Sequence, residues 1–191
     1  MSKLLVIRHA QASFMAEDYD ELSEFGHQQS AALGQYLVER GVQIDQAVIG
    51  PLKRHTQTAN HVKTAFQRQG KKWKETIHPA FEEHLAPEIT RYFLEKWNKN
   101  AEHKAITDTK AHKKQYFKAF EQIFRKWIND ELDLSDTEFE KWSLFKNKVV
   151  NGLQEVMKEY DNGSTTAIFT SGGTTGVITG AALGLPDEKA V

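Results

Sequence analysis

The chain of 191 residues has the length of one domain, with room for an inserted subdomain. Hydrophobic residues form 39% of it, enough for one core, and the formal net charge of -1 excludes a general attraction to nucleic acid or anionic membranes. The absence of cysteine excludes a disulfide scaffold, a thiolate metal site and a cysteine nucleophile, and it fits a cytoplasmic location. The N-terminal apolar run is too short for a secretory signal, and no run is long enough for a membrane helix.

Short apolar runs without alternation predict buried parallel strands. In chain order they are Leu4 to Ile7, Ala47 to Ile49, Thr76 to His78 and Ala167 to Thr170. Apolar residues at helical spacing predict helices between them, over His27 to Arg40 and His55 to Gln69. This alternation predicts an α/β fold of three layers, in which helices flank a mostly parallel central sheet.

A different pattern, from about residue 88 to residue 160, interrupts the alternation of strands and helices. Its aromatic residues recur at helical spacing, which predicts amphipathic helices. We therefore expect a single domain over residues 1–191, with a helical cap insertion at about 88–160 that packs over the sheet. The lysines of residues 96–118 and the acids of residues 130–140 are best explained as solvated helix faces. The alternative is a basic rim that steers an anionic substrate.

Candidate functional residues follow the predicted strands, where ligands gather in parallel sheets. Arg8 and His9 come directly after the first strand. Arg54 falls at or in the first turn of the helix after the second strand, where a cation opposes the helix dipole unless an anion lies between them. The turn of Gly172 and Gly173 leads into a helix and offers backbone N–H groups to an anion. Together these residues predict an anion-binding site.

The segment after the third predicted strand carries two acids, Glu82 and Glu83. A carboxyl group in this place can act as a general acid if burial raises its pKa. The alternative is a pair of exposed loop acids. The eight histidines have no metal-ligand spacing, and the chain contains neither HExxH nor GxSxG. We therefore expect no metal site and no cofactor.

These motifs resemble, in the same order, those of the histidine phosphatase superfamily, the phosphoglycerate-mutase-like group. Residues 6–14 resemble its Arg-His-Gly signature, and residues 22–30 resemble its Leu-Ser/Thr-x-x-Gly-x-x-Gln-Ala stretch. Residues 50–59 resemble its Ser-Pro-Leu-x-Arg-x-x-Gln-Thr-Ala stretch, and residues 81–83 resemble its Leu-x-Glu element. Residues 169–173 fall where the family has Ser-His-Gly-Gly.

The resemblance implies a metal-independent phosphomonoester hydrolase that forms a phosphohistidine on His9. Arg8 and Arg54 would clamp the phosphoryl oxygens and stabilise the transition state. Glu83, with Glu82 as the alternative, would protonate the leaving oxygen and then deprotonate water. The phosphate-binding residues would be Arg8, Arg54, Ser13, Gly172, Gly173 and Thr174.

Gly172 is the main departure, because the family has a second phosphate-binding histidine at this position. Loss of one such donor costs on the order of 10²–10³ in rate. Backbone N–H groups of Gly172 and Gly173, with Thr174, could replace it in part. His84 or His55 reaching into the site is the other option.

Two alternative functions stay open at this point. A catalytically weak phospho-ligand binding domain would explain Gly172. A phosphoglycerate-mutase-type phosphotransferase ranks below it, because Met15 stands where mutases often carry a polar phosphate ligand. Ala10, in place of the usual glycine after the histidine, is a small change.

The expected partner is a phosphorylated small molecule or a phosphopeptide, with no nucleic acid or membrane. Family members usually continue beyond the region of Leu183 to Pro186 into further strands. Either the sequence is truncated or its sheet lacks the last strand. An uncovered sheet edge favours association, for example as a homodimer.

Overall fold

A parallel sheet forms the centre of the computed structural model, which describes residues 1–13, 20–99, 113–160 and 163–190. Its strand order is β1-β4-β2-β3, and every neighbouring pair is parallel. The register pairs Arg8 with Thr170 and Ile49 with Phe169, so the carboxyl ends of the strands meet at one edge. The strands are β1 (Lys3–Arg8), β2 (Gln46–Ile49), β3 (Lys74–Ile77) and β4 (Thr165–Thr170).

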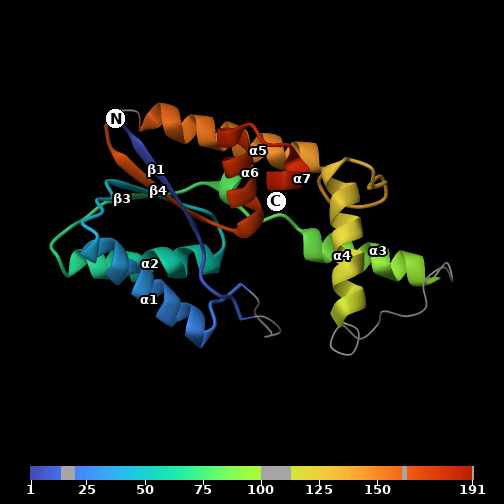
Figure 1. Ribbon diagram of the computed structural model, residues 1–191, viewed down its shortest axis with the longest axis horizontal. Coiled ribbons are helices and arrows are strands. Elements are labelled where there is room, and N and C mark those ends of the chain that lie inside the picture. Colours follow the sequence, from blue (N-terminus) through green and yellow to red (C-terminus); the bar gives the residue numbers. More distant parts are fainter. Residues whose placement is uncertain (14–19, 100–112, 161–162, 191) are drawn as a thin grey trace.

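Two layers of helices cover the sheet, which confirms the predicted three-layer α/β fold (Figure 1). Side chains along a strand alternate between faces, so Ala47 and Ile49 pack with α1 (Glu24–Glu39) and α2 (Lys53–Gln67). Val48 points to the opposite face, where it joins the core formed with α5 (Trp142–Glu159) and α6 (Gly172–Leu183). The two central strands, β2 and β4, are therefore buried on both faces, as the absence of alternation predicted. The strand predicted at Thr76 to His78 corresponds to β3, which is exposed because it lies at the edge of the sheet, so the expectation of burial was wrong there.

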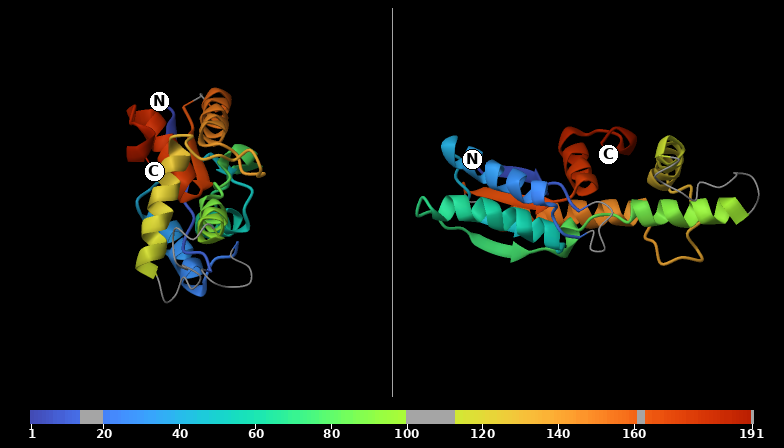
Figure 2. Two further views of the ribbon diagram at one scale, coloured as in Figure 1. Left: turned by 90° about the vertical axis from the view of Figure 1, so that its right-hand side faces the viewer. Right: turned by 90° about the horizontal axis from the view of Figure 1, so that it is seen from below.

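Two further helices, α3 (Ala86–Lys99) and α4 (Lys113–Ile128), lie beyond the carboxyl ends of the strands (Figures 1 and 2). The helical segment expected at about 88–160 thus has two parts in space. One part, α3 with α4, projects past the sheet, whereas α5 packs on the sheet itself. The short 3₁₀ helix η1 (Pro79–Phe81) joins β3 to this region.

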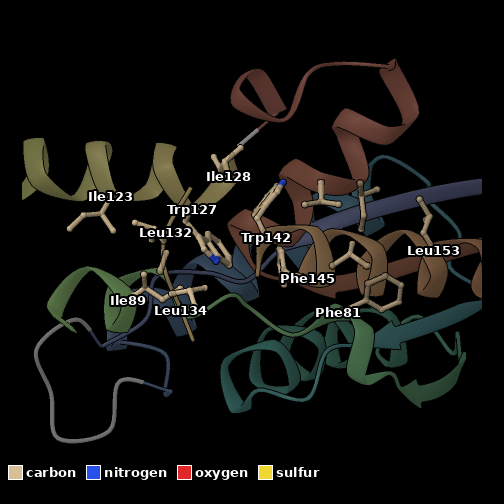
Figure 3. Close-up of a cluster of buried hydrophobic side chains, with 14 of the residues drawn as sticks. Phe81, Ile89, Ile123, Trp127, Ile128, Leu132, Leu134, Trp142, Phe145 and Leu153 are labelled. Atoms are coloured by element: carbon tan, nitrogen blue, oxygen red, sulfur yellow. The ribbon is translucent and has the colours of Figure 1, made fainter. Parts of the chain in front are cut away.

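An aromatic cluster connects the projecting helices to the core (Figure 3). Trp127 of α4 lies edge-on to Trp142 of α5, with 5.2 Å between ring centroids, and both side chains are fully buried. Trp142 also donates its indole N–H to Asp187 of α7 (Asp187–Ala190) at 2.7 Å. Burial of such large rings makes this cluster a major source of stability for the region.

Some sequence expectations fall outside the described residues. Met15, which bears on the mutase alternative, lies there, and so does a large part of the lysine run of residues 96–118. Within the described ranges, no helix combines the length and the apolarity that a membrane span requires.

Candidate active site

His9 is fixed directly after β1 by its backbone, because its N–H donates to the Thr170 carbonyl at 2.8 Å. The ring nitrogen Nδ1 lies 2.6 Å from the Ala10 carbonyl oxygen. Since a carbonyl can only accept, Nδ1 carries the ring proton and Nε2 holds a lone pair. Arg54 donates its Nε–H to that lone pair at 3.2 Å. Burial lowers the pKa of His9, and the charges of Arg54 and Arg8 lower it further, so the ring is neutral near pH 7.

Arg54 is held at the start of α2, with only 7% of its side chain exposed. Its Nη1 donates to Oδ1 of Asp20 at 2.8 Å, and the second oxygen of Asp20 accepts the Lys53 N–H at 2.9 Å. A carboxylate at the start of a helix interacts favourably with the helix dipole, and here it also fixes the Arg54 guanidinium. Asp20 is a site residue that sequence reasoning missed. It lies 33 positions before Lys53, and no local pattern marks it.

The first turns of α2 also hold the loop that follows His9. Thr58 donates its hydroxyl to the Arg54 carbonyl at 2.8 Å and accepts the Ala10 N–H at 3.2 Å. The Gln57 side chain accepts the Leu22 N–H at 2.8 Å. The Gln-Thr pair of the sequence motif therefore orients the loop that follows His9.

The loop of Glu82 and Glu83 is fastened to the end of β4. The Thr170 hydroxyl donates to the Phe81 carbonyl at 2.7 Å, and the Thr174 hydroxyl donates to the Glu82 carbonyl at 2.5 Å. The side chain of Glu82 is exposed. Glu83 is the acid whose charge acts on His9, where it raises the pKa of the imidazole against the lowering effects.

Arg8 lies beside the glycine turn at the start of α6. A Cβ placed on Gly172 would be 3.4 Å from Nε of Arg8, so position 172 faces this guanidinium. In the described part of the chain, no carboxylate forms a salt bridge with Arg8, and its side chain is exposed at the site. The first N–H groups of a helix have no intrahelical acceptor, so Gly172 and Gly173 add donors next to this cation.

Of the two histidines considered as substitutes for the missing one, His55 is buried and His84 is partly exposed. His55 is fully buried, its ring centroid is 5.6 Å from that of His9, and its Nε2 lies 2.6 Å from the Ser171 hydroxyl. Burial lowers the pKa of His55 to about 3, with further lowering by His9 and Arg54. His84 packs against Gly173, where an added Cβ would be 2.3 Å from its Nε2.

Most of the predicted residues therefore converge at the carboxyl edge of the sheet, namely Arg8, His9, Arg54, Glu83, Gly172 and Gly173. Thr174 is fully buried, and its hydroxyl is occupied by the Glu82 carbonyl. Ser13 is placed by its backbone, which donates to the Glu21 carbonyl at 2.8 Å. A cleft of about 610 Å³ opens beside His9, lined by Arg8, His9, Ala10, Gln11, Ala12, Phe25, Gln29, Ser30, Leu33 and Thr58.

Residues 4–123 match the sequence profile of the histidine phosphatase superfamily (branch 1). The chain belongs to this superfamily. The match includes the positions of His9, Arg8, Arg54 and Glu83. No curated protein matches the chain significantly. The superfamily assignment supports a phosphatase or phosphotransferase.

Solved structures of this superfamily's fold resemble the chain over nearly all its length. The alpha-ribazole phosphatase of Shigella flexneri has a TM-score of 0.63 and 18% identity, over 98% of this chain and 82% of that one. Phosphoglycerate mutase of Bacillus anthracis has a TM-score of 0.63 and 17% identity, over 93% and 78%. A mycobacterial glucosyl-3-phosphoglycerate phosphatase has a TM-score of 0.62 and 17% identity, over 98% and 82%. At such identities the likeness establishes the fold alone.

Proposed function

We propose that this histidine phosphatase superfamily member is a metal-independent phosphomonoester hydrolase that acts through a phosphohistidine on His9. The observation that carries the proposal is the state of His9. Its Nδ1 is bonded to the Ala10 carbonyl at 2.6 Å, so the Nε2 lone pair faces Arg54 in a neutral ring. An oriented neutral imidazole beside guanidinium groups is suited to attack on phosphorus.

In the first step, the Nε2 lone pair of His9 forms a bond to phosphorus while the bond to the leaving oxygen breaks. Glu83 gives that oxygen its proton. The Nε–H of Arg54, which donates to Nε2 in the free protein, changes its acceptor to a phosphoryl oxygen. Arg8 and the N–H groups at the start of α6 bind the remaining phosphoryl oxygens. The positive charge on the ring is stabilised by Nδ1–H donation to Ala10.

In the second step, water attacks the phosphohistidine. The Glu83 carboxylate takes a proton from the water, and the bond between phosphorus and Nε2 breaks. Inorganic phosphate leaves, and His9 returns to its neutral form. Division into two displacements is the usual benefit of covalent catalysis.

The proposed substrate is a phosphorylated small molecule or a phosphopeptide. The cleft of about 610 Å³ beside His9 is large enough for a phosphoester of moderate size and is open to water. Hydrolysis is favoured over mutase activity, because a mutase must retain its intermediate and exclude water. A cytoplasmic location, the absence of nucleic-acid and membrane partners, and association as a homodimer stay predictions from the sequence.

Gly172 favours one second candidate, a phospho-ligand binding domain with weak catalysis. The site would then bind phosphate through Arg8 and Arg54 with little turnover. A binding site needs neither a nucleophile nor an acid, so the presence of His9 and Glu83 ranks this candidate lower.

The test is hydrolysis of p-nitrophenyl phosphate in the presence of EDTA by wild type, His9→Ala and His27→Ala. His27 is the matched control, because it lies on α1 and contacts His61 at 2.9 Å, away from the cleft. We expect turnover in wild type and His27→Ala and none in His9→Ala. Equal turnover in all three would overturn the proposal. If all are inactive here and on a panel of phosphoesters, but bind inorganic phosphate, the binding function takes its place.

A further inference from the structure

The residue after the proposed acid, His84, is enclosed by the projecting helices. Its side chain is 11% exposed. Its ring centroid lies 5.3 Å from Phe124 and 5.4 Å from Trp127, both on α4, and 5.6 Å from Phe145 on α5. Burial lowers the pKa of His84, against opposing effects of Glu83 and other acids, so the ring is neutral near pH 7.

The hydrogen bonds of His84 determine which nitrogen carries the proton. Its Nδ1 accepts the N–H of Ala86, the first residue of α3, at 3.2 Å. A neutral imidazole that accepts at Nδ1 carries its proton on Nε2. That Nε2 lies 3.5 Å from Oε1 of Glu83, a close contact that is longer than a normal direct hydrogen bond. The same oxygen accepts the backbone N–H of His84 at 3.2 Å.

Gly173 forms the opposite wall of this pair. A Cβ at position 173 would lie 2.3 Å from Nε2 of His84 and 2.8 Å from Oε1 of Glu83. The imidazole and the carboxylate therefore occupy the space that a side chain at position 173 would take. The absence of a side chain at position 173 therefore lets the pair pack against the start of α6.

We propose that His84 is the positioning residue for Glu83, which it holds toward His9 through Nε2. Because the same ring bonds to α3 and packs on α4 and α5, the orientation of the carboxylate is coupled to the position of the projecting helices. His84 transfers no proton itself. The inference rests on the proposed function, in which Glu83 is the acid.

Two aryl phosphates test it through kcat/KM, which reports the steps up to departure of the leaving group. Phenyl phosphate has a poor leaving group and needs the acid, whereas 2,4-dinitrophenyl phosphate has a good one and does not. His84→Phe keeps the aromatic packing and removes both ring nitrogens. We expect kcat/KM for phenyl phosphate to fall by about tenfold or more, as loss of general acid assistance predicts. The value for the dinitrophenyl ester should stay within about twofold of wild type, since its leaving group needs little protonation.

Two amide variants separate the roles of the ring nitrogens. His84→Gln can place a donor near the position of Nε2, and it should recover part of the rate on phenyl phosphate. His84→Asn can keep the acceptor for Ala86 but has no donor at the Nε2 position, so it should not recover the rate on phenyl phosphate. This pair also keeps the test decisive if His84→Phe does not fold.

Glu83→Gln separates failure of this inference from failure of the proposed function. It should have the same leaving-group selectivity, and adding His84→Phe to it should cause no further loss on phenyl phosphate. If Glu83→Gln is selective but His84→Phe slows both esters equally, His84 serves packing alone and the inference is wrong. If Glu83→Gln lacks selectivity, the assignment of the acid fails, and the inference fails with it.

Discussion

Arg54 and His9 share one hydrogen bond, in which the arginine Nε–H donates to the histidine Nε2 at 3.2 Å across 45 positions of sequence. A guanidinium can only donate, so this contact exists only while Nε2 is unprotonated. The residue that we propose binds phosphate therefore also favours the unprotonated form of the proposed nucleophile before substrate arrives. Asp20 fixes the other end of the guanidinium at 2.8 Å.

Arg54→Lys should lower kcat/KM for aryl phosphates by about 100-fold or more. The reason is that a lysine ammonium lacks the planar set of N–H donors with which the guanidinium can contact His9, Asp20 and phosphate together. Steady-state kinetics measures the loss. Arg40→Lys is the matched control, since Arg40 lies over the Tyr36 ring at the end of α1. A loss below about threefold in Arg54→Lys would mean that the fork geometry is unimportant.

The titration of His9 should have its midpoint below the ordinary value of about 6.5, since burial and two arginines lower the pKa of this ring. Protonation removes the nucleophile, so kcat/KM should fall only at pH values below that lowered pKa. NMR of protein with isotope-labelled histidine measures the midpoint, and the signal that is lost in His9→Ala identifies the resonance of His9. Arg8→Gln should move the midpoint upward, because it removes one lowering charge. A midpoint at or above 6.5 in wild type would contradict the geometry described for Nε2.

Acid should destabilise the protein through His55, whose pKa is lowered to about 3 in the folded state. The unfolded chain protonates this residue near pH 6.5, so between these values the unfolded state binds the extra proton. The contribution of His55 to the free energy of unfolding should therefore fall by about 1.4 kcal/mol for each pH unit below 6.5. Urea unfolding of wild type and His55→Gln between pH 6 and pH 5 measures the difference in slope. Equal slopes would refute the prediction.

The two glycines of the turn should differ sharply in their tolerance of alanine. Gly173→Ala places a Cβ 2.3 Å from His84 Nε2, so the side chains of His84 and Glu83 must shift. We expect a loss of about tenfold or more in kcat/KM for phenyl phosphate, through misplaced acid catalysis. Gly172→Ala meets Arg8 at 3.4 Å, an ordinary contact distance, and keeps the backbone N–H, so it should change the rate little. Similar losses in both variants would contradict the packing of the pair against Gly173.

The fold class could be predicted because β1, β2 and β4 contain continuous apolar runs, and the strands alternate with helices along the chain. The strand order could not, because no local pattern places β4 between β1 and β2. Both predicted helices begin earlier in the structure than their apolar spacing indicates, α1 at Glu24 and α2 at Lys53. Ser23 caps α1 by accepting the Gly26 N–H at 3.0 Å, so the helix begins before its first periodic apolar residue. The side of the sheet that α5 covers could not be predicted, because an amphipathic pattern shows which side of a helix is buried but not what it packs against.

Within the site, motif residues at strand ends were predictable, but the contacts that orient them were not. Asp20 pairs with Arg54 across 34 positions, and Thr174 bonds to Glu82 across 92 positions. No local spacing encodes such distant pairs. The Thr174 hydroxyl was expected to bind phosphate, whereas in the structure it donates to a backbone carbonyl.

The position of β4 in the sheet also governs when the site can exist during synthesis. His9 follows β1 and Arg54 follows β2, yet these two strands do not pair, because β4 lies between them and bonds to both. During synthesis, His9 and Arg54 leave the ribosome long before residues 165–170, the strand that joins β1 to β2. Parallel pairing over such a separation is slow to form. Before β4 docks, a nascent chain therefore carries the side chains that we propose bind phosphate, but it lacks the strand that brings His9 and Arg54 to the same sheet edge.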